Sequence, residues 1–191
     1  MHTARQNEII QKALQLIDSN GIQGLTIKNL SKEIGISEPA IYRHFENKED
    51  IIMSILHMFR QHSEQIMIQV SKKETVSEQM DVLFEQYMHS FQNNPALVAV
   101  IFSEELFRNE GAQRELTSAI IAKNMTQVTK MLEKGVQQGT IRNDIPCEHL
   151  AYMMLGSLRL FVKNWQLSGF QFPLIEKGRE LISSIKTLIV R

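Results

Sequence analysis

The stretch from Thr26 to Lys48 holds residues whose types and spacing predict contact with DNA. Two short helical segments are joined there through Gly35-Ile36-Ser37. This is the arrangement of a helix-turn-helix, because glycine adopts the positive φ of a sharp turn at little cost. Pro39-Ala40 keeps the start of the second segment slim, as entry into the major groove requires. The residues predicted to hold both segments against the preceding helix are Ile27, Leu30, Ile34, Ile41 and Phe45.

Helical periodicity dominates the elements that must position this motif, and strand-like alternation of useful length is absent from the sequence. Thr26, Ser37 and Asn47 are the expected N-caps, with Asp50 at the capping-box position after Asn47. Gly21 is expected to end the first helix. The helices are predicted at residues 5–20, 26–34, 37–45, 47–70, 76–93, 96–108, 112–138, 148–168 and 174–190. We therefore expect an all-α protein of about nine helices, with a three-helix helix-turn-helix DNA-binding domain at 1–48 and a larger helical effector-binding and dimerisation domain at 49–191.

The net charge of the chain does not by itself indicate a DNA-binding protein. Twenty-one basic residues balance 21 acidic ones, and residues 1–50 hold six Lys and Arg against seven Asp and Glu. Because nucleic-acid binders are often basic, the positive charges must here be placed locally. This balance is the one feature that favours a different hypothesis, in which the protein is a small-molecule carrier with a vestigial DNA-binding domain.

Other classes of protein find little support in the sequence. The six histidines are scattered without a metal-binding pattern, and no phosphate loop, cofactor motif or catalytic set is present, so we expect no metal, no cofactor and no enzyme activity. The most apolar stretch, Leu150 to Val162, contains Arg159 and is too short to cross a bilayer. A single cysteine, Cys147, rules out an internal disulfide and fits a reducing cytoplasm.

The motif resembles the DNA-binding domain of the TetR family of bacterial regulators. The matching residues are Thr26, Gly35-Ile36-Ser37, Pro39-Ala40, Tyr42, His44-Phe45 and Lys48. The departures are few, since Ser31 and Ile34 stand where alanine is usual and Pro39 stands where glycine is usual. The motif covers about a quarter of the chain, and the remainder resembles the family in its length and its all-helical pattern.

The resemblance implies a role for each matched residue. Thr26, Tyr42, His44 and Lys48 would contact phosphates and set the register, whereas Ser37, Pro39, Ala40 and Arg43 would meet base edges. Ala40 suits a thymine methyl group, and Arg43 would either pair with guanine or grip the backbone. Lys28 and Lys32 are either further phosphate contacts or solvated charges.

The last two predicted helices indicate a homodimer. The segment Leu150 to Val162 is apolar on nearly all sides, so one face packs on its own bundle and the other needs a partner. The final helix sets Leu174, Gly178, Leu181, Ile185 and Leu188 at heptad-like spacing. Two such helices from each subunit would form a four-helix interface, as in the resembling family. A two-fold dimer would bind a pseudo-palindromic double-stranded operator.

The middle helices are rich in Met and aromatic residues, which line adaptable pockets but are also ordinary core. The residues chosen as a pocket for an unknown small-molecule effector are Phe84, Tyr87, Met88, Phe102, Met125, Tyr152 and Trp165. The resulting hypothesis is a repressor released from its operator by a small apolar ligand. The alternatives are an activator, and a regulator whose C-terminal domain binds a protein partner.

Overall fold

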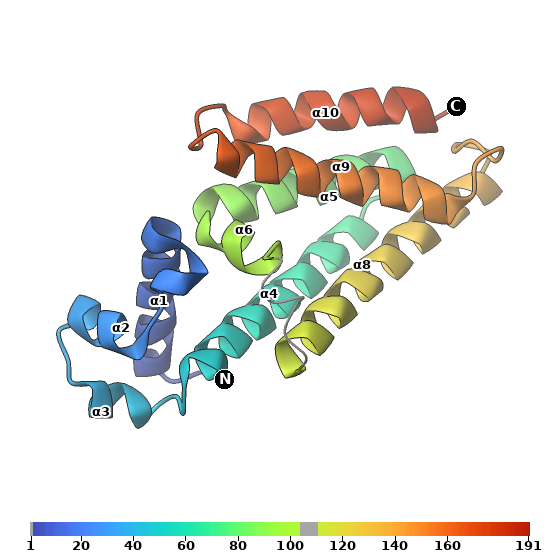
Figure 1. Ribbon diagram of the computed structural model, residues 1–191. Helices are drawn as coiled ribbons and strands as arrows, with labels where there is room; N and C mark the ends of the chain where they lie inside the picture. The colour runs from blue at the N-terminus through green and yellow to red at the C-terminus, as the bar shows by residue number, and fades with distance from the viewer. Residues whose placement is uncertain (1, 104–110) are drawn as a thin grey trace. The chain divides into compact units, whose positions relative to one another are not determined.

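The computed structural model describes residues 2–103 and 111–191, and the regular elements of these residues are α-helices (Figure 1). The helices, with the labels of Figure 1, are α1 (Ala4–Gly24), α2 (Ile27–Ile34), α3 (Glu38–Tyr42), α4 (Lys48–Ser71), α5 (Val76–Asn93), α6 (Ala96–Ile101), α8 (Ala112–Gln137), α9 (Cys147–Leu167) and α10 (Leu174–Ile189). One isolated antiparallel bridge joins Ile141 to Val190. The predicted all-α fold is confirmed. Most of the predicted continuation of α6, at 104–108, lies outside the described residues. No helix among the described residues is long and apolar enough to span a membrane.

The described chain forms two compact units. The first unit consists of residues 1–60 with 94–117, and the second unit consists of residues 61–93 with 118–191. Both α4 and α8 pass from one unit into the other. The N-terminal half of α4 belongs to the first unit, where Ile51, Ile52 and Ile55 are buried. The expected division after residue 48 lies at the start of α4, and the boundary between the two units falls within the same helix.

In the first unit, α1 packs against α2, and α2 packs against α3 (Figure 1). Thr3 and Gln6 form a capping box that starts α1, since the Gln6 amide donates to Thr3 Oγ1 at 3.2 Å and the Thr3 amide donates to Gln6 Oε1 at 2.9 Å. Gly21 interrupts α1 with a φ of 68°. The buried core residues of these three helices include Ile9, Ile10, Ala13, Leu14, Ile17, Leu30 and Ile41. Full burial of one such large aliphatic side chain contributes about 1.5–3 kcal/mol.

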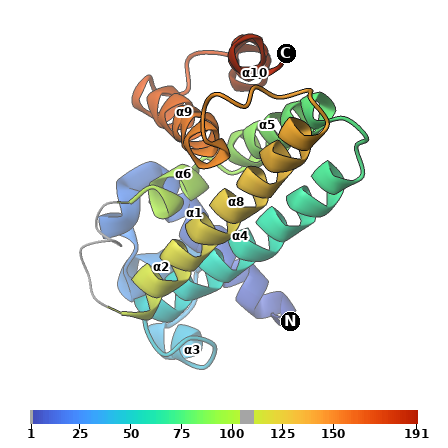
Figure 2. The ribbon, with the colours of Figure 1, turned by 90° about the vertical axis from the view of Figure 1, so that its right-hand side faces the viewer.

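In the second unit, α10 packs along α5 and against α9 (Figure 2). Gly178 of α10 makes the close approach, because a Cβ atom at this position would lie 2.9 Å from Met88 Cγ on α5. Two ion pairs also join α10 to α5, one between Lys186 and Asp81 at 2.7 Å and the other between Arg179 and Glu85. Gly178 thus allows α10 to pack closely on α5 of the same chain.

The connection from α9 to α10 turns through two residues with left-handed backbones. Gly169 has a φ of 69° and Phe170 a φ of 65°. A left-handed conformation costs a residue with a side chain about 1–2 kcal/mol. The Phe170 ring meets Trp165 edge-on with 4.7 Å between centroids, a contact worth about 0.5–1.5 kcal/mol, so the ring contact offsets much of the strain.

Candidate nucleic-acid interface

The turn between α2 and α3 has the geometry that the sequence predicts. Thr26 caps α2, because its Oγ1 accepts a hydrogen bond from the Asn29 amide at 3.0 Å. Gly35 ends α2 in the left-handed region with a φ of 77°, and its amide donates to the Ser31 carbonyl at 2.9 Å. The Ile36 amide donates to the same carbonyl at 3.0 Å. The sharp turn between the two helices therefore depends on glycine.

The recognition helix α3 is shorter than predicted. It comprises Glu38–Tyr42, with proline in its first turn, so Arg43 and His44 follow its end. Ser37 occupies the N-cap position, but its side chain makes no capping hydrogen bond, which corrects the expectation for this residue. An N-cap side chain accepts from the second or third amide of its helix. Pro39 has no amide hydrogen, and the Ala40 amide donates to the Ser37 backbone carbonyl at 2.9 Å. The Ser37 hydroxyl is therefore left exposed at the entrance of the recognition helix.

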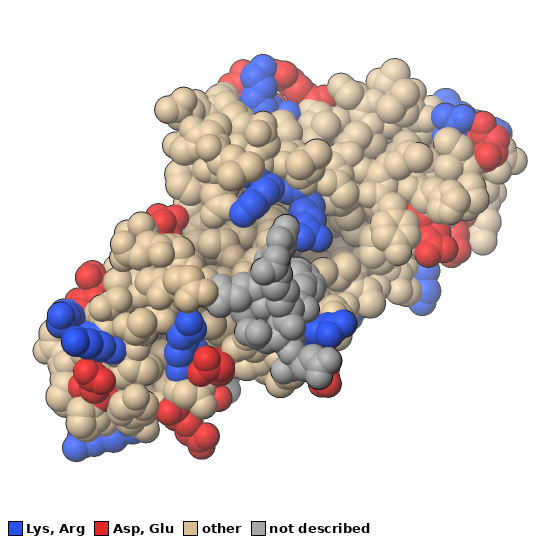
Figure 3. Space-filling model, in the orientation of Figure 1, with Lys and Arg blue, Asp and Glu red and all other residues tan. Residues whose placement is uncertain are grey.

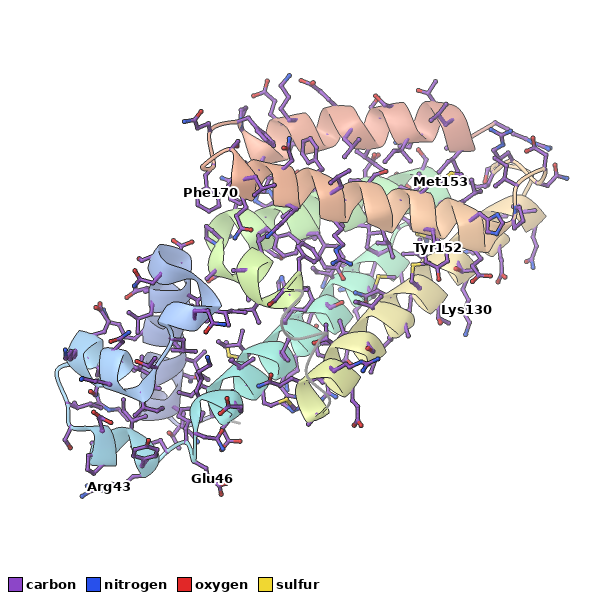
Figure 4. The ribbon with its side chains drawn as sticks, viewed as in Figure 1. Arg43, Glu46, Lys130, Tyr152, Met153 and Phe170 are labelled. Carbon is purple, nitrogen blue, oxygen red and sulfur yellow. The ribbon has the colours of Figure 1, made fainter. Side chains whose placement is uncertain are left out.

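The residues predicted to contact DNA lie at the surface of the first unit. Beneath them, Leu30, Ile41 and Phe45 are at most 5% exposed. Tyr42 is 51% exposed although it is a large aromatic residue, and Figure 4 shows Arg43 at the outer edge of the unit. The predicted contacts that are exposed are Thr26, Lys28, Ser37, Pro39, Tyr42 and Arg43, and those that are half-buried are Ala40, His44 and Lys48.

The cations of this motif have no ion-pair partner among the residues that the structure describes. Lys28, Arg43 and Lys48 lie more than 4 Å from every carboxylate of the described residues, and so does Lys32. On α1, by contrast, Lys12 pairs with Glu33 at 3.6 Å. Figure 3 shows basic and acidic side chains interspersed over the visible face of the molecule. On that face the charges are mixed, which is consistent with local cations that remain available for phosphates.

One positioning residue was missed by the sequence analysis. The Gln6 side-chain amide donates to the His44 carbonyl at 3.3 Å, so that α1 holds the turn that follows α3. The Thr3-x-x-Gln6 pattern of a capping box is visible in the sequence, but the contact with His44 spans 38 positions and depends on tertiary packing.

The residues predicted to line a pocket are distributed over both units. Phe84 and Met88 line a cavity of about 260 Å³ between α5 and α10, together with Gly178. Tyr87 and Trp165 are buried elsewhere in the second unit, and Met125 is half-buried. Tyr152 is 60% exposed on α9, and Phe102 belongs to the first unit. The structure thus brings two of the seven predicted residues together at this cavity.

A polar cluster of three side chains, of which Ser63 and Tyr87 are buried and Asn124 is half-buried, joins α4, α5 and α8 in the second unit. Ser63 Oγ lies 2.7 Å from Tyr87 OH and donates to Asn124 Oδ1 at 2.9 Å, while Asn124 Nδ2 donates to Tyr87 OH at 3.0 Å. Burial raises the pKa of the Tyr87 phenol above its ordinary value, so this residue remains neutral. The sequence analysis identified only Tyr87 of this cluster.

The last two helices present large apolar side chains to solvent. Met153, Leu160 and Leu167 of α9 are 54%, 71% and 74% exposed. Leu188 of α10 is 68% exposed, whereas Leu174 and Ile185 of the predicted heptad are buried within the unit. Figure 4 shows where Tyr152 and Met153 lie on α9. Met153, Leu160 and Leu167 are seven positions apart and so lie along one face of α9, and exposed apolar surface of this kind is typical of an interaction site.

Two protein-family models match the chain. A model described as bacterial regulatory proteins of the tetR family matches residues 9–55, and a model described as the C-terminal region of YsiA-like proteins matches residues 57–191. Together they cover the helix-turn-helix and nearly all of the remaining chain.

Similar proteins extend the comparison. The Fatty acid metabolism regulator protein of Bacillus subtilis (strain 168) is 23% identical over 176 residues, with 92% of this chain and 90% of that protein covered. The crystal structure of the transcriptional regulator FadR from Bacillus subtilis in complex with stearoyl-CoA matches with a TM-score of 0.80 at 21% identity, over 96% of this chain and 97% of that one. The structure of AibR in complex with isovaleryl coenzyme A and operator DNA matches with a TM-score of 0.78 at 17% identity, over 94% and 97% of the two chains. At these identities the structural likenesses establish the fold.

Proposed function

Since the chain belongs to the TetR family of bacterial regulatory proteins, we propose that it is a homodimeric repressor that an acyl-coenzyme A thioester releases from a pseudo-palindromic operator. The observation that carries the DNA-binding part is the set of cations without carboxylate partners among the described residues. Lys28 lies on α2, Arg43 directly follows α3 and Lys48 begins α4, and the start of the recognition helix α3 is slim. Free cations next to a helix that fits the major groove are what phosphate contact and base reading require.

The proposal for the effector rests on the similar proteins and on the chemistry of the second unit. FadR and AibR were both crystallised with coenzyme A thioesters, and AibR also with operator DNA. The second unit offers the cavity between α5 and α10 and a wider groove between α4 and α8. The dimer would have two states, one whose recognition helices are spaced to fit the operator and one whose recognition helices are not. A ligand that binds the second state more tightly weakens DNA binding by the difference between its affinities for the two states. The proposed effector acts by binding more tightly to the state that does not fit the operator.

The proposed dimer would use the exposed apolar faces of α9 and α10. Met153, Leu160 and Leu188 would leave water in a two-fold contact of these helices with a second copy. Such a dimer presents two recognition helices to successive major grooves, about 34–36 Å apart.

The test uses DNA enriched by this protein from a random duplex library, and the readout is fluorescence anisotropy. We expect the selected sites to be pseudo-palindromic, and we expect palmitoyl-CoA to lower the operator affinity at least tenfold while free coenzyme A leaves it unchanged. Selection of no sequence would contradict the DNA-binding proposal. Sequence-specific binding that no acyl-CoA of any chain length changes would contradict the proposed effector alone.

A further inference from the structure

A groove on the second unit runs between the C-terminal half of α4 and α8, with α5 beneath it. Its volume is about 550 Å³, which lies within the range of small-molecule sites, about 300–1,000 Å³. All of its lining residues belong to the second unit. The groove is distinct from the cavity between α5 and α10, with which it shares no lining residue.

The floor of the groove is apolar. Met67, Val70 and Met131 are at most 9% exposed, and they present side chains that an alkyl chain can contact. Ile68 at the same groove is 47% exposed, so that a large aliphatic side chain stands in water. An occupant with an apolar chain would cover it and remove that surface from solvent. Methionine adapts its shape to different chains, which suits a site for flexible ligands.

The rim of the groove is cationic. It carries three lysines, Lys123, Lys130 and Lys134, against a single carboxylate, Glu64. Glu64 is already paired with Lys123 at 2.7 Å. Lys130 and Lys134 are exposed and have no carboxylate within 4 Å among the described residues, and Figure 4 shows Lys130 extending from α8. They lie one helical turn apart, where two like charges repel each other. An anion bound between them would relieve this repulsion.

We propose that this groove binds the phosphate-bearing end and adjoining chain of a single-chain acyl amphiphile, with Lys130 and Lys134 as the phosphate contacts. The apolar floor selects the chain and the two unpaired ammonium groups select the anionic head. An acyl-CoA thioester and a lysophosphatidate share this chemistry. The inference rests on the proposed function in so far as it locates the effector on α4 and α8.

The groove is placed to act on α4. At one end, α4 and α8 are joined by Glu64 with Lys123 and by Ser63 with Asn124. Tyr87 of α5 completes the second of these contacts. An occupant therefore contacts α4 just beyond a point at which it is fixed to its neighbours. The same helix begins at Lys48, six residues after the recognition helix ends, so that a movement of α4 reaches the proposed DNA contacts through continuous backbone.

The test measures ligand binding to the full chain by titration calorimetry, with lauroyl-CoA, lauroyl-lysophosphatidate and laurate each below its critical micelle concentration. In the double variant Lys130→Gln/Lys134→Gln we expect at least a tenfold loss of affinity for both phosphate-bearing probes. We also expect the affinity of the wild type for these probes to depend more strongly on salt than that of the double variant. Laurate affinity should change less than twofold. Lys130→Arg/Lys134→Arg should retain binding, and Lys163→Gln/Lys177→Gln, which alters lysines of α9 and α10, should leave it unchanged.

The outcomes separate this inference from the proposed function. If lauroyl-CoA binds and releases DNA equally well in the double variant, the groove is wrong and the effector class stands. If lauroyl-lysophosphatidate binds in a lysine-dependent way and lauroyl-CoA does not bind, the groove stands and the proposed effector is wrong. If neither phosphate-bearing probe binds the wild type, both are overturned.

Discussion

At the scale of single residues, the cations that have no carboxylate partner among the described residues carry most of the functional argument. A chain with equal numbers of acidic and basic residues has no excess charge with which to attract DNA. Lys12 of α1 is paired with Glu33 of α2, whereas Lys48 and Arg43 have no such partner in the described structure. These two cations are available to phosphates and bases, and each allows a specific prediction.

Lys48 begins α4, where backbone amides also point outward, so we expect it to contact a phosphate. Lys48→Ala should weaken binding to cognate and random duplexes by similar factors. Each phosphate contact contributes about 0.9 to the slope of log K against log salt, so the slope should fall by about one. Anisotropy titrations at several salt concentrations measure it. Lys72→Ala, just beyond the opposite end of α4, is the control, and an unchanged slope for Lys48→Ala would remove this residue from the phosphate set.

Arg43 directly follows α3 and is exposed, so its guanidinium group can reach either a guanine edge or the backbone. If it reads guanine, Arg43→Ala should lower affinity for the cognate site by about 1–3 kcal/mol and relax the preference at one base pair of each half-site. Binding to a panel of single-base operator variants measures this. A loss of equal size at every position would instead assign Arg43 to the backbone.

At the scale of elements, the turn between α2 and α3 is the point where local sequence decides the geometry. Gly35 has a φ of 77°, and a Cβ atom there would meet nothing within 4 Å, so conformational strain alone opposes a side chain. Gly35→Ala should lower the free energy of unfolding by about 1–2 kcal/mol, while Gly35→Asn should cost less because asparagine tolerates the left-handed region. Urea denaturation followed by circular dichroism compares them. Equal losses for alanine and asparagine would mean that crowding, rather than backbone strain, fixes this glycine.

The elements also show what the sequence could predict. Thr26, Asn47 and Gly35 were correctly placed because caps depend on residues within one turn of each other. The lack of a capping hydrogen bond at Ser37 was also predictable, because Pro39 stands at the second helical position and has no amide hydrogen to donate. The contact of Gln6 with His44 and the cluster of Ser63 with Asn124 join distant segments. Periodicity assigns such residues to a face but does not identify their partner.

At the scale of the whole molecule, the proposed function requires a second copy, because one short recognition helix offers few base contacts. The predicted heptad of α10 is divided in the structure, with Leu174 and Ile185 buried inside the unit and Leu188 facing solvent. Leu188, like Leu160 of α9, is a large apolar side chain that a monomer would leave in water. Burial of apolar area is the main favourable term in such associations.

Leu160→Glu and Leu188→Glu should therefore dissociate the dimer, because two-fold symmetry places each new carboxylate in the interface twice and leaves it without a partner. We expect the dissociation constant to rise at least tenfold, which corresponds to about 1.4 kcal/mol. Sedimentation velocity at micromolar concentration measures it, and Ile121→Glu, an exposed apolar residue of α8, is the matched control. The dissociated variants should retain their helical circular dichroism and bind a single half-site as the wild type does, while losing affinity for the full operator. If they remain dimeric and Ile121→Glu dissociates instead, the interface lies on α8, and the spacing of the two half-sites must be explained from that helix.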